Sequence, residues 1–235
     1  MIYLTGDMHG KIDSSRYRFF ANFMEEEDIL IVLGDFGFVW YGVGGDQRNL
    51  DKLSRLCKGT ILFIAGNHEN YNSLYQDYPI NDFKGIRVHN IKDNIKHILP
   101  NQIFELEEKS FLTIDGAFSI DREHRVLNRT WWEQEIPSLE ELENFISTVK
   151  ENQTKIEYIL SHEAPLNVKV RLINNKDDIR VPKEYENNMT QVLQNAYEIL
   201  LNNHQFKHWY FGHYHDDKKI DLSSSCLYRT IEEIK

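Results

Sequence analysis

The first third of the chain alternates short apolar runs with helix-forming segments, and this alternation restricts the fold more than any other feature. The runs at residues 2–5, 28–35 and 60–67 are aliphatic, and each ends at or beside a glycine. The segments between them, residues 13–24 and 46–57, have helical spacing of apolar residues and begin with an aspartate suited to capping a helix. This order predicts a parallel sheet with right-handed crossovers.

The middle of the chain has the pattern of further strands. Strand-like runs follow one another over residues 85–119 without helices between them, so we expect antiparallel pairing there. Alternating helix and strand patterns then follow at 138–150, 155–162, 188–203 and 207–213, with short strands at 218–222 and 226–231. We therefore predict an α/β fold of two packed, mixed β-sheets flanked by helices, as a single domain over residues 1–235.

Metal-ligating side chains collect where the predicted strands end. The first three strands end in Gly-Asp-x-His, Gly-Asp and Gly-Asn-His motifs, and later strands end in Ser-His and Gly-His-x-His. Because ligands gather beyond the carboxyl ends of parallel strands, we expect these side chains to share one site. The residues in these motifs are Asp7, His9, Asp35, Asn67, His68, His162, His213 and His215.

His213 and His215 follow Gly212 and an aromatic run that is typical of a strand. In an extended chain, residues i and i+2 point to the same side, so we expect both imidazoles to face one site. Such a pair alone also fits two solvated rings. The other strand ends favour the metal interpretation, with each ring directed at a different ion.

The mixture of carboxylates, imidazoles and one amide suits a pair of divalent ions. Two such ions about 3.5–4 Å apart need an anionic ligand between them, and a carboxylate can serve. Neutral outer ligands then keep the net charge moderate. This donor set suits transition metals better than calcium, so we expect two divalent metal ions, with manganese first and iron, nickel, zinc or magnesium as alternatives.

In this order, the motifs resemble those of the calcineurin-like metallophosphoesterases. The resemblance spans residues 6 to 215 and implies the four-layer sandwich of that superfamily, in which two sheets lie between helices. By position, it implies a first metal held by Asp7, His9, Asp35 and His215. It implies a second metal held by Asp35, Asn67, His162 and His213, with Asp35 bridging the two ions.

The activity implied by the resemblance is hydrolysis of a phosphomono- or phosphodiester, and we expect a small nucleotide-like substrate. A hydroxide bridging the metals would attack phosphorus in line. Asp35 and His68 would be catalytic, with His68 facing the leaving group, and Asn67 would also contact substrate. A general acid in this position typically contributes about 10²–10⁴ in rate.

An arginine- and tryptophan-rich segment at 116–135 lies between the third and fourth motifs. A similar segment occurs in some bacterial and phage members of the superfamily. We expect Arg122 or Arg125 to bind a substrate phosphate, and we expect Arg122 to be a catalytic residue as well. Trp131 and Trp132 either line the cleft or pack in the core, and the arginines alternatively pair with nearby glutamates.

One departure bears on the substrate. Protein Ser/Thr phosphatases of the superfamily continue the second motif as Gly-Asp-x-Val-Asp-Arg-Gly, whereas residues 34–40 here are Gly-Asp-Phe-Gly-Phe-Val-Trp. We hypothesise that Asp121 and Arg122 replace the missing aspartate and arginine. A protein Ser/Thr phosphatase and a catalytically silent metal-binding module remain alternatives. The glycine-rich residues 42–45 lack the Lys-Ser/Thr of a P-loop, so we expect a plain loop.

The bulk properties restrict partners and location. The formal net charge is −10, which argues against tight nonspecific binding to nucleic acid. No apolar run approaches the roughly 20 residues of a membrane span, and the first residues lack the features of a signal peptide. The two cysteines, Cys57 and Cys226, are too few for a disulfide framework. We therefore expect a cytoplasmic protein with a small phosphorylated substrate and no membrane partner, and we leave the oligomeric state open.

Overall fold

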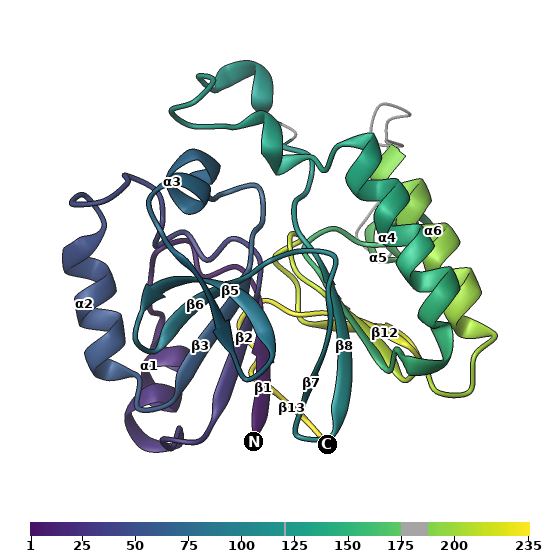
Figure 1. Cartoon of the computed structure of the whole chain (residues 1–235), viewed down its shortest axis with the longest axis horizontal. Helices are drawn as coiled ribbons and strands as arrows, with labels where there is room; N and C mark the ends of the chain where they lie inside the picture. The colour runs from purple at the N-terminus through teal and green to yellow at the C-terminus, as the bar shows by residue number, and fades with distance from the viewer. Residues whose placement is uncertain (120, 175–187) are drawn as a thin grey trace.

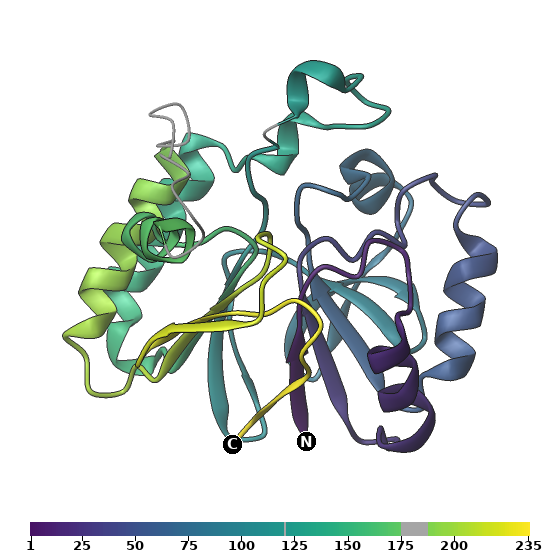
Figure 2. The same ribbon diagram turned by 180° about the vertical axis from the view of Figure 1, so that it is seen from behind.

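Two mixed β-sheets lie side by side with helices on their outer faces in the computed structural model, which describes residues 1–119, 121–174 and 188–235 (Figures 1 and 2). In this part of the chain, one sheet has seven strands in the order β13-β1-β2-β3-β6-β5-β4. The other has six, in the order β11-β12-β10-β9-β8-β7. The predicted fold class, two packed mixed sheets flanked by helices, is confirmed.

The sheets and helices have the following bounds. The seven-stranded sheet contains β1 (Ile2–Thr5), β2 (Ile29–Leu33), β3 (Thr60–Ile64), β4 (Ile80–Phe83), β5 (Ile86–Lys92), β6 (Ile95–Ile98) and β13 (Glu232–Ile234). The six-stranded sheet contains β7 (Ile103–Leu106), β8 (Lys109–Ile114), β9 (Tyr158–Ser161), β10 (His208–Phe211), β11 (Lys218–Asp221) and β12 (Ser224–Cys226). The α-helices are α1 (Ser14–Asn22), α2 (Gln47–Leu56), α3 (Tyr71–Gln76), α4 (Leu139–Asn152), α5 (Leu166–Asn174) and α6 (Asn188–Leu201). The short 3-10 helices are η1 (Arg122–His124), η2 (Glu133–Glu135) and η3 (Gln153–Lys155).

Three apolar clusters hold these layers together. Between the sheets, Leu4 and Ile31 of the first sheet pack in one cluster with Phe111 and Leu160 of the second. The opposite face of the first sheet is covered by α1, α2 and α3, and that of the second by α4, α5 and α6 (Figure 1). The strands β1, β2 and β3 are parallel neighbours, as are β8, β9, β10 and β12. Their carboxyl ends therefore meet at one edge.

The expectation of antiparallel pairing over residues 85–119 is only partly right. Strands β5 and β6 are antiparallel, as are β7 and β8. However, β6 pairs parallel with β3, and β8 pairs parallel with β9. The hairpin of β4 and β5 reverses the chain before β6, so β6 enters the sheet in the direction of β3. Of the strand predicted at 226–231, only Cys226 lies in a strand, as the last residue of β12. Residues 227–231 instead join β12 in one sheet to β13 in the other.

The predicted aspartate caps differ in what their side chains do. Asp13 caps α1, since its carboxylate accepts hydrogen bonds from the backbone N–H groups of Ser15 and Arg16. Asp46 stands at the same position of α2 but makes no cap hydrogen bond. Its Oδ2 instead accepts from the N–H groups of residues 40–42, which shapes the preceding loop. Among the described helices, none is long and apolar enough to cross a membrane.

Candidate metal centre

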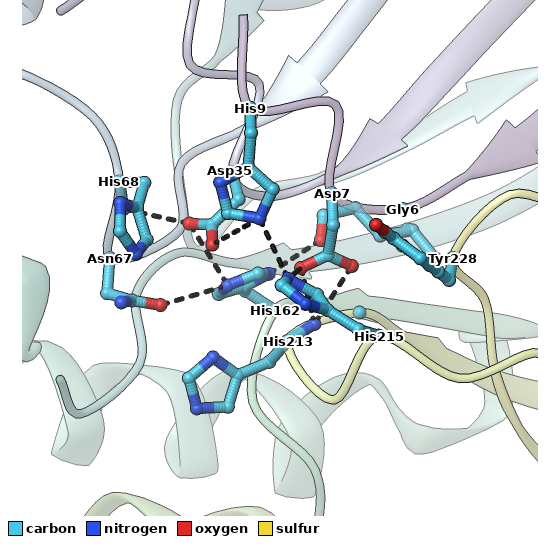
Figure 3. Close-up of polar contacts among 12 residues, drawn as sticks. Gly6, Asp7, His9, Asp35, Asn67, His68, His162, His213, His215 and Tyr228 are labelled. Carbon is cyan, nitrogen blue, oxygen red and sulfur yellow. Dashed lines mark hydrogen bonds and ion pairs between the residues drawn. The ribbon is translucent and has the colours of Figure 1, made fainter. Parts of the chain in front are cut away.

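The predicted ligands occupy tight turns directly after parallel strands. Asp7 and His9 follow β1, Asp35 follows β2, and His213 and His215 follow β10. All five have positive φ, between 42° and 70°. This left-handed conformation is uncommon for residues with a side chain and is found where the surrounding structure imposes it, often at functional sites. Here it reverses the chain sharply enough for side chains from different strands to converge (Figure 3).

Four of the predicted ligands form one tight group. The ligand atoms of Asp7, His9, Asp35 and His215 all lie within 4.8 Å of one another. The Nε2 atoms of His9 and His215 are 2.8 Å apart, His9 Nε2 is 3.6 Å from Asp35 Oδ2, and His215 Nε2 is 3.5 Å from Asp7 Oδ1. Ligands at about 2.0–2.2 Å from a common ion have similar spacings. The group is the set predicted to hold the first metal.

Three members of the second predicted set also lie together. His162 Nε2 is 3.2 Å from Asp35 Oδ1 and 3.1 Å from Asn67 Oδ1. The other ring nitrogen, Nδ1, lies 2.7 Å from the carbonyl oxygen of Leu33 and can donate a hydrogen bond to it. Such a bond fixes the ring and leaves Nε2 as the atom directed at the site. Asp35 thus lies between the two groups, as a bridging ligand must.

His213 is placed differently from the expectation. Its backbone N–H donates to both carboxylate oxygens of Asp7, at 3.0 and 3.1 Å. Its ring lies beside the His162 ring, with centroids 4.9 Å apart, and Figure 3 shows no polar contact from it to Asp35. Contrary to our expectation, His213 and His215 do not share one side of an extended strand, because both residues are in left-handed turns. Its role as a ligand stays a prediction.

The charges in this cluster are strongly interdependent. Burial raises the pKa of Asp7 to about 8. Burial also opposes ionisation of Asp35, but the charge of His162 outweighs it and lowers the pKa of Asp35. Conversely, burial disfavours a charged His162, while Asp35 raises its pKa to about 10. Asp7 is only 1% exposed and Asp35 only 2%. Two carboxylates this deeply buried are stabilised as anions only by positive charge nearby, which divalent cations would supply. The donor set and its charge fit metal ions.

Comparison with known families settles the assignment. A family model described as calcineurin-like phosphoesterase matches residues 1–217.

The chain belongs to this family.

Family membership makes the chain a metal-dependent phosphoester hydrolase, and it confirms the resemblance inferred from the motifs. The ligand atoms of Asp7, His9, Asp35 and His215 lie close enough together to hold a metal ion of the kind that such an enzyme uses. A search of curated proteins found no matching relative. The substrate must therefore be inferred from the chain itself.

Glu69 ties together two ligand loops of this phosphoesterase. Its side chain is completely buried, and its carboxylate oxygens accept from the N–H groups of Gly37 and Gly66, at 2.7 and 2.6 Å. The loop after β2, which carries Asp35, is thereby joined to the loop after β3, which carries Asn67. Burial raises the pKa of Glu69 to about 8. Glu69 was not among the predicted site residues, although it directly follows His68 in the third motif.

Arg16 holds the loop after β1 by a hydrogen bond to its backbone. Its buried guanidinium donates to the carbonyl oxygens of Gly6 and Tyr228, and its Nη1 lies 2.6 Å from Asp13 Oδ2. The Tyr228 ring in turn stacks on His215, with centroids 4.8 Å apart (Figure 3). No motif in the sequence marks Arg16 or Tyr228. The hydrogen bond between Arg16 and Tyr228 joins segments more than 200 residues apart.

The arginine-rich segment lies above the strand ends, between β8 and α4 (Figure 1). Arg125, not Arg122, reaches the site: its Nη2 donates to His68 Nε2 at 2.9 Å, and its Nε lies 2.8 Å from Asp121 Oδ1. Arg122 instead lies over the rings of Phe118 and Trp131, at 5.0 and 5.3 Å from their centroids. The geometry therefore favours Arg125 as the phosphate-binding arginine.

The two tryptophans of the segment have separate roles. Trp132 is buried and packs against Trp40 in the core, which agrees with the core-packing interpretation. Trp131 is half-buried beneath Arg122. Ser119, at the start of the segment, accepts a hydrogen bond of 3.0 Å from Asn67 Nδ2. That bond directs the amide oxygen of Asn67 toward His162, an arrangement that no sequence motif predicts.

Proposed function

We propose that this chain is a phosphoesterase that hydrolyses a phosphomono- or phosphodiester of a small, nucleotide-like substrate with two divalent metal ions. The observation that carries the proposal is the convergence of Asp7, His9, Asp35 and His215, with Asp35 also contacting His162. One carboxylate therefore touches two groups of ligands. A single ion bound by the first group would leave the oxygen of Asn67 and the Nε2 of His162 with no metal to coordinate.

The ligand assignments follow from this arrangement. The first ion would be held by Asp7, His9, Asp35 and His215, and the second by Asp35, Asn67 and His162. His213 would complete the second set. When bound, such ions lower the pKa of water toward neutrality and stabilise charge on the phosphoryl oxygens. Manganese is the ion we expect first, with iron, nickel, zinc or magnesium as alternatives.

His68 and Arg125 are the residues of this chain that would act on the substrate phosphate. Arginine can only donate, so the contact of 2.9 Å requires His68 Nε2 to accept, and the ring to be neutral. Burial, the main cause, and the Arg125 charge both lower the pKa of His68. A substrate phosphate bound by Arg125 would draw the guanidinium away and offset its charge. His68 would then be free to hold a proton and donate it to the leaving oxygen.

The observations favour a small substrate over a phosphoprotein. The second motif lacks the Asp-Arg pair of the protein Ser/Thr phosphatases, and Arg125 with Asp121 occupies the neighbourhood of His68 instead. The formal net charge of −10 argues against tight nonspecific binding of nucleic acid. Free, buried Cys57 and Cys226 agree with a reducing compartment, and we propose the cytoplasm.

A substrate and metal panel tests the proposal. Phosphomonoesters, cyclic mononucleotides, cyclic dinucleotides, phosphopeptides and bis(p-nitrophenyl) phosphate would be assayed with Mn²⁺, Ni²⁺ and Mg²⁺, and bound metal would be counted. We expect turnover of a nucleotide and two ions per chain. Asp35→Asn should lose both activity and metal, whereas Asp93→Asn, at an exposed aspartate, should retain them. Bound metal without turnover of any substrate would indicate a silent module, and preference for phosphopeptides a protein phosphatase.

A further inference from the structure

A recess borders the cluster of Asp7, His9, Asp35 and His215 on the side of His9 and His68. Its volume is about 350 Å³, within the range of small-molecule sites. Besides those two histidines, its walls include Lys11, Phe38, Trp40, Tyr41, Asp46 and Asn49. A substrate whose phosphate contacts the cluster would place its remaining part here. The recess therefore bears on which phosphoester the enzyme accepts.

Trp40 forms a fixed wall of this recess. Its ring stacks near the His68 ring, with centroids 5.8 Å apart and planes 28° apart, and meets the buried Trp132 edge-on at 5.3 Å. Its carbonyl oxygen accepts a hydrogen bond of 3.0 Å from Asn70 Nδ2. These contacts hold the indole from both the ring and the backbone.

Tyr41 is the exposed aromatic at the mouth of the recess. It is 77% exposed, although its backbone is tightly held. Its N–H is one of three that donate to Asp46 Oδ2, at 2.7, 2.8 and 3.0 Å. A Cβ at Gly45 would lie 2.5 Å from the Cβ of Tyr41, so the loop closes directly on this residue. A buried carboxylate thus presents a large aromatic side chain to solvent beside the cluster.

We propose that this recess binds the nucleobase of the substrate, with Tyr41 as a stacking surface and Trp40 as the wall; this rests on the proposed function. Aromatic side chains bind bases through their faces, with little dependence on sequence. Lys11 and Asn49 supply polar groups for the edges of a base. The ring of a phosphotyrosine has no such edge groups, so the nucleoside is the better match.

A matched pair of substrates tests the inference. Adenosine 5′-monophosphate and ribose 5-phosphate share the sugar phosphate and differ in the base. We expect kcat/KM to be higher for the nucleotide by about 5- to 150-fold, the range of base stacking on an aromatic residue. Tyr41→Ala should reduce that ratio toward one, and Tyr41→Phe should preserve it. Tyr17→Ala, at an exposed tyrosine of α1, should leave it unchanged. Equal kcat/KM values for the two substrates, or a ratio unaffected by Tyr41→Ala, would overturn the inference.

A binding measurement separates this inference from the proposed function. Saturation-transfer NMR with adenosine and with ribose needs no metal and no turnover. We expect transfer to the base protons of adenosine with the wild type and with Tyr17→Ala, and its loss with Tyr41→Ala. Transfer to the base protons in a protein that hydrolyses none of the substrates would support base binding in the recess and contradict the proposed hydrolase activity. Turnover without base contact would reject the recess alone, as would stronger binding of a phosphotyrosine peptide than of the nucleotide.

Discussion

Substitution of the two arginines should separate their roles. Arg125→Ala removes the guanidinium beside His68 and should lower kcat/KM by about 10- to 100-fold, because a charge-assisted phosphate contact typically contributes about 1.5–3 kcal/mol. Arg122→Ala removes a stacking contact away from the cluster and should change kcat/KM less than threefold. Steady-state kinetics on the best substrate, with Mn²⁺ held constant, would measure both. A larger effect at Arg122 would return the phosphate-binding role to that residue.

Individual residues at this site were predictable to different degrees. Asp7 and Asp35 follow aliphatic strands and carry ligand chemistry, so position in the sequence was enough to find them. The direction of the His213 ring was not predictable, because it depends on a positive φ of 70° that no pattern encodes. The choice between Arg125 and Arg122 was also out of reach. It depends on how η1 turns, which places one guanidinium on His68 and the other on Trp131.

At the scale of elements, the aliphatic strands and the two 14-residue helices, α4 and α6, were found from sequence because their signals are local. The capping box of α4, made by Ser138 and Glu141, is present as predicted. The short elements α3 and β4 were missed, since six and four residues give little periodicity. Asp46 shows the limit of a local rule. A residue suited to capping stands at the cap position, yet its carboxylate is used by the loop before the helix.

Asp46→Ala should release that loop. Three backbone N–H groups lose their acceptor, and we expect the free energy of unfolding to fall by about 1–3 kcal/mol. Limited proteolysis should also become faster between residues 41 and 46. Urea denaturation and mass spectrometry of the fragments would measure the two effects. Asp93→Ala serves as the control at an exposed aspartate, and unchanged cleavage of the loop in Asp46→Ala would mean that the backbone holds its shape without the carboxylate.

At the scale of the whole molecule, the parallel centre of each sheet was easier to predict than its edges. Buried central strands such as β2 are aliphatic along their whole length, and that composition is visible in the sequence. Which strand pairs with which is decided by partners far apart in the chain. The pairing of β13 with β1 joins residues more than 220 positions apart, and nothing local to residues 232–234 announces it.

Acid stability should depend on a buried histidine far from the metal cluster. Burial lowers the pKa of His208 to about 4, below its ordinary value of 6.5. Between these values the unfolded chain binds more protons than the folded one, so stability falls as the pH drops from 6.5 toward 4. His208→Gln should remove up to about 1.4 kcal/mol per pH unit from that slope. Denaturation curves from pH 7 to 4.5 would show this, with exposed His204→Gln as the control. An identical slope in His208→Gln and wild type would refute it.

Removal of metal should destabilise the molecule as a whole. Ligands from one sheet, such as Asp35, and from the other, such as His162, meet in one cluster, so an ion that binds there stabilises only the folded chain. We expect Tm to fall on chelation and to recover with Mn²⁺. At a metal concentration 1,000 times Kd, binding should raise the free energy of unfolding by about 4 kcal/mol. Asp35→Asn should show no such response. Equal Tm with and without metal would contradict the assignment.

The cluster spans the seam between the two sheets, and this has a consequence for the order of assembly. Neither half of the chain holds a full set of ligands: His215 must arrive from the later half before Asp7, His9 and Asp35 form a complete cage. The chain must be synthesised as far as His215 before a metal ion could contact all four side chains of this group. Metal binding at this group would therefore follow the packing of the two sheets against each other, and a bound ion would mark a chain whose two halves are already folded together.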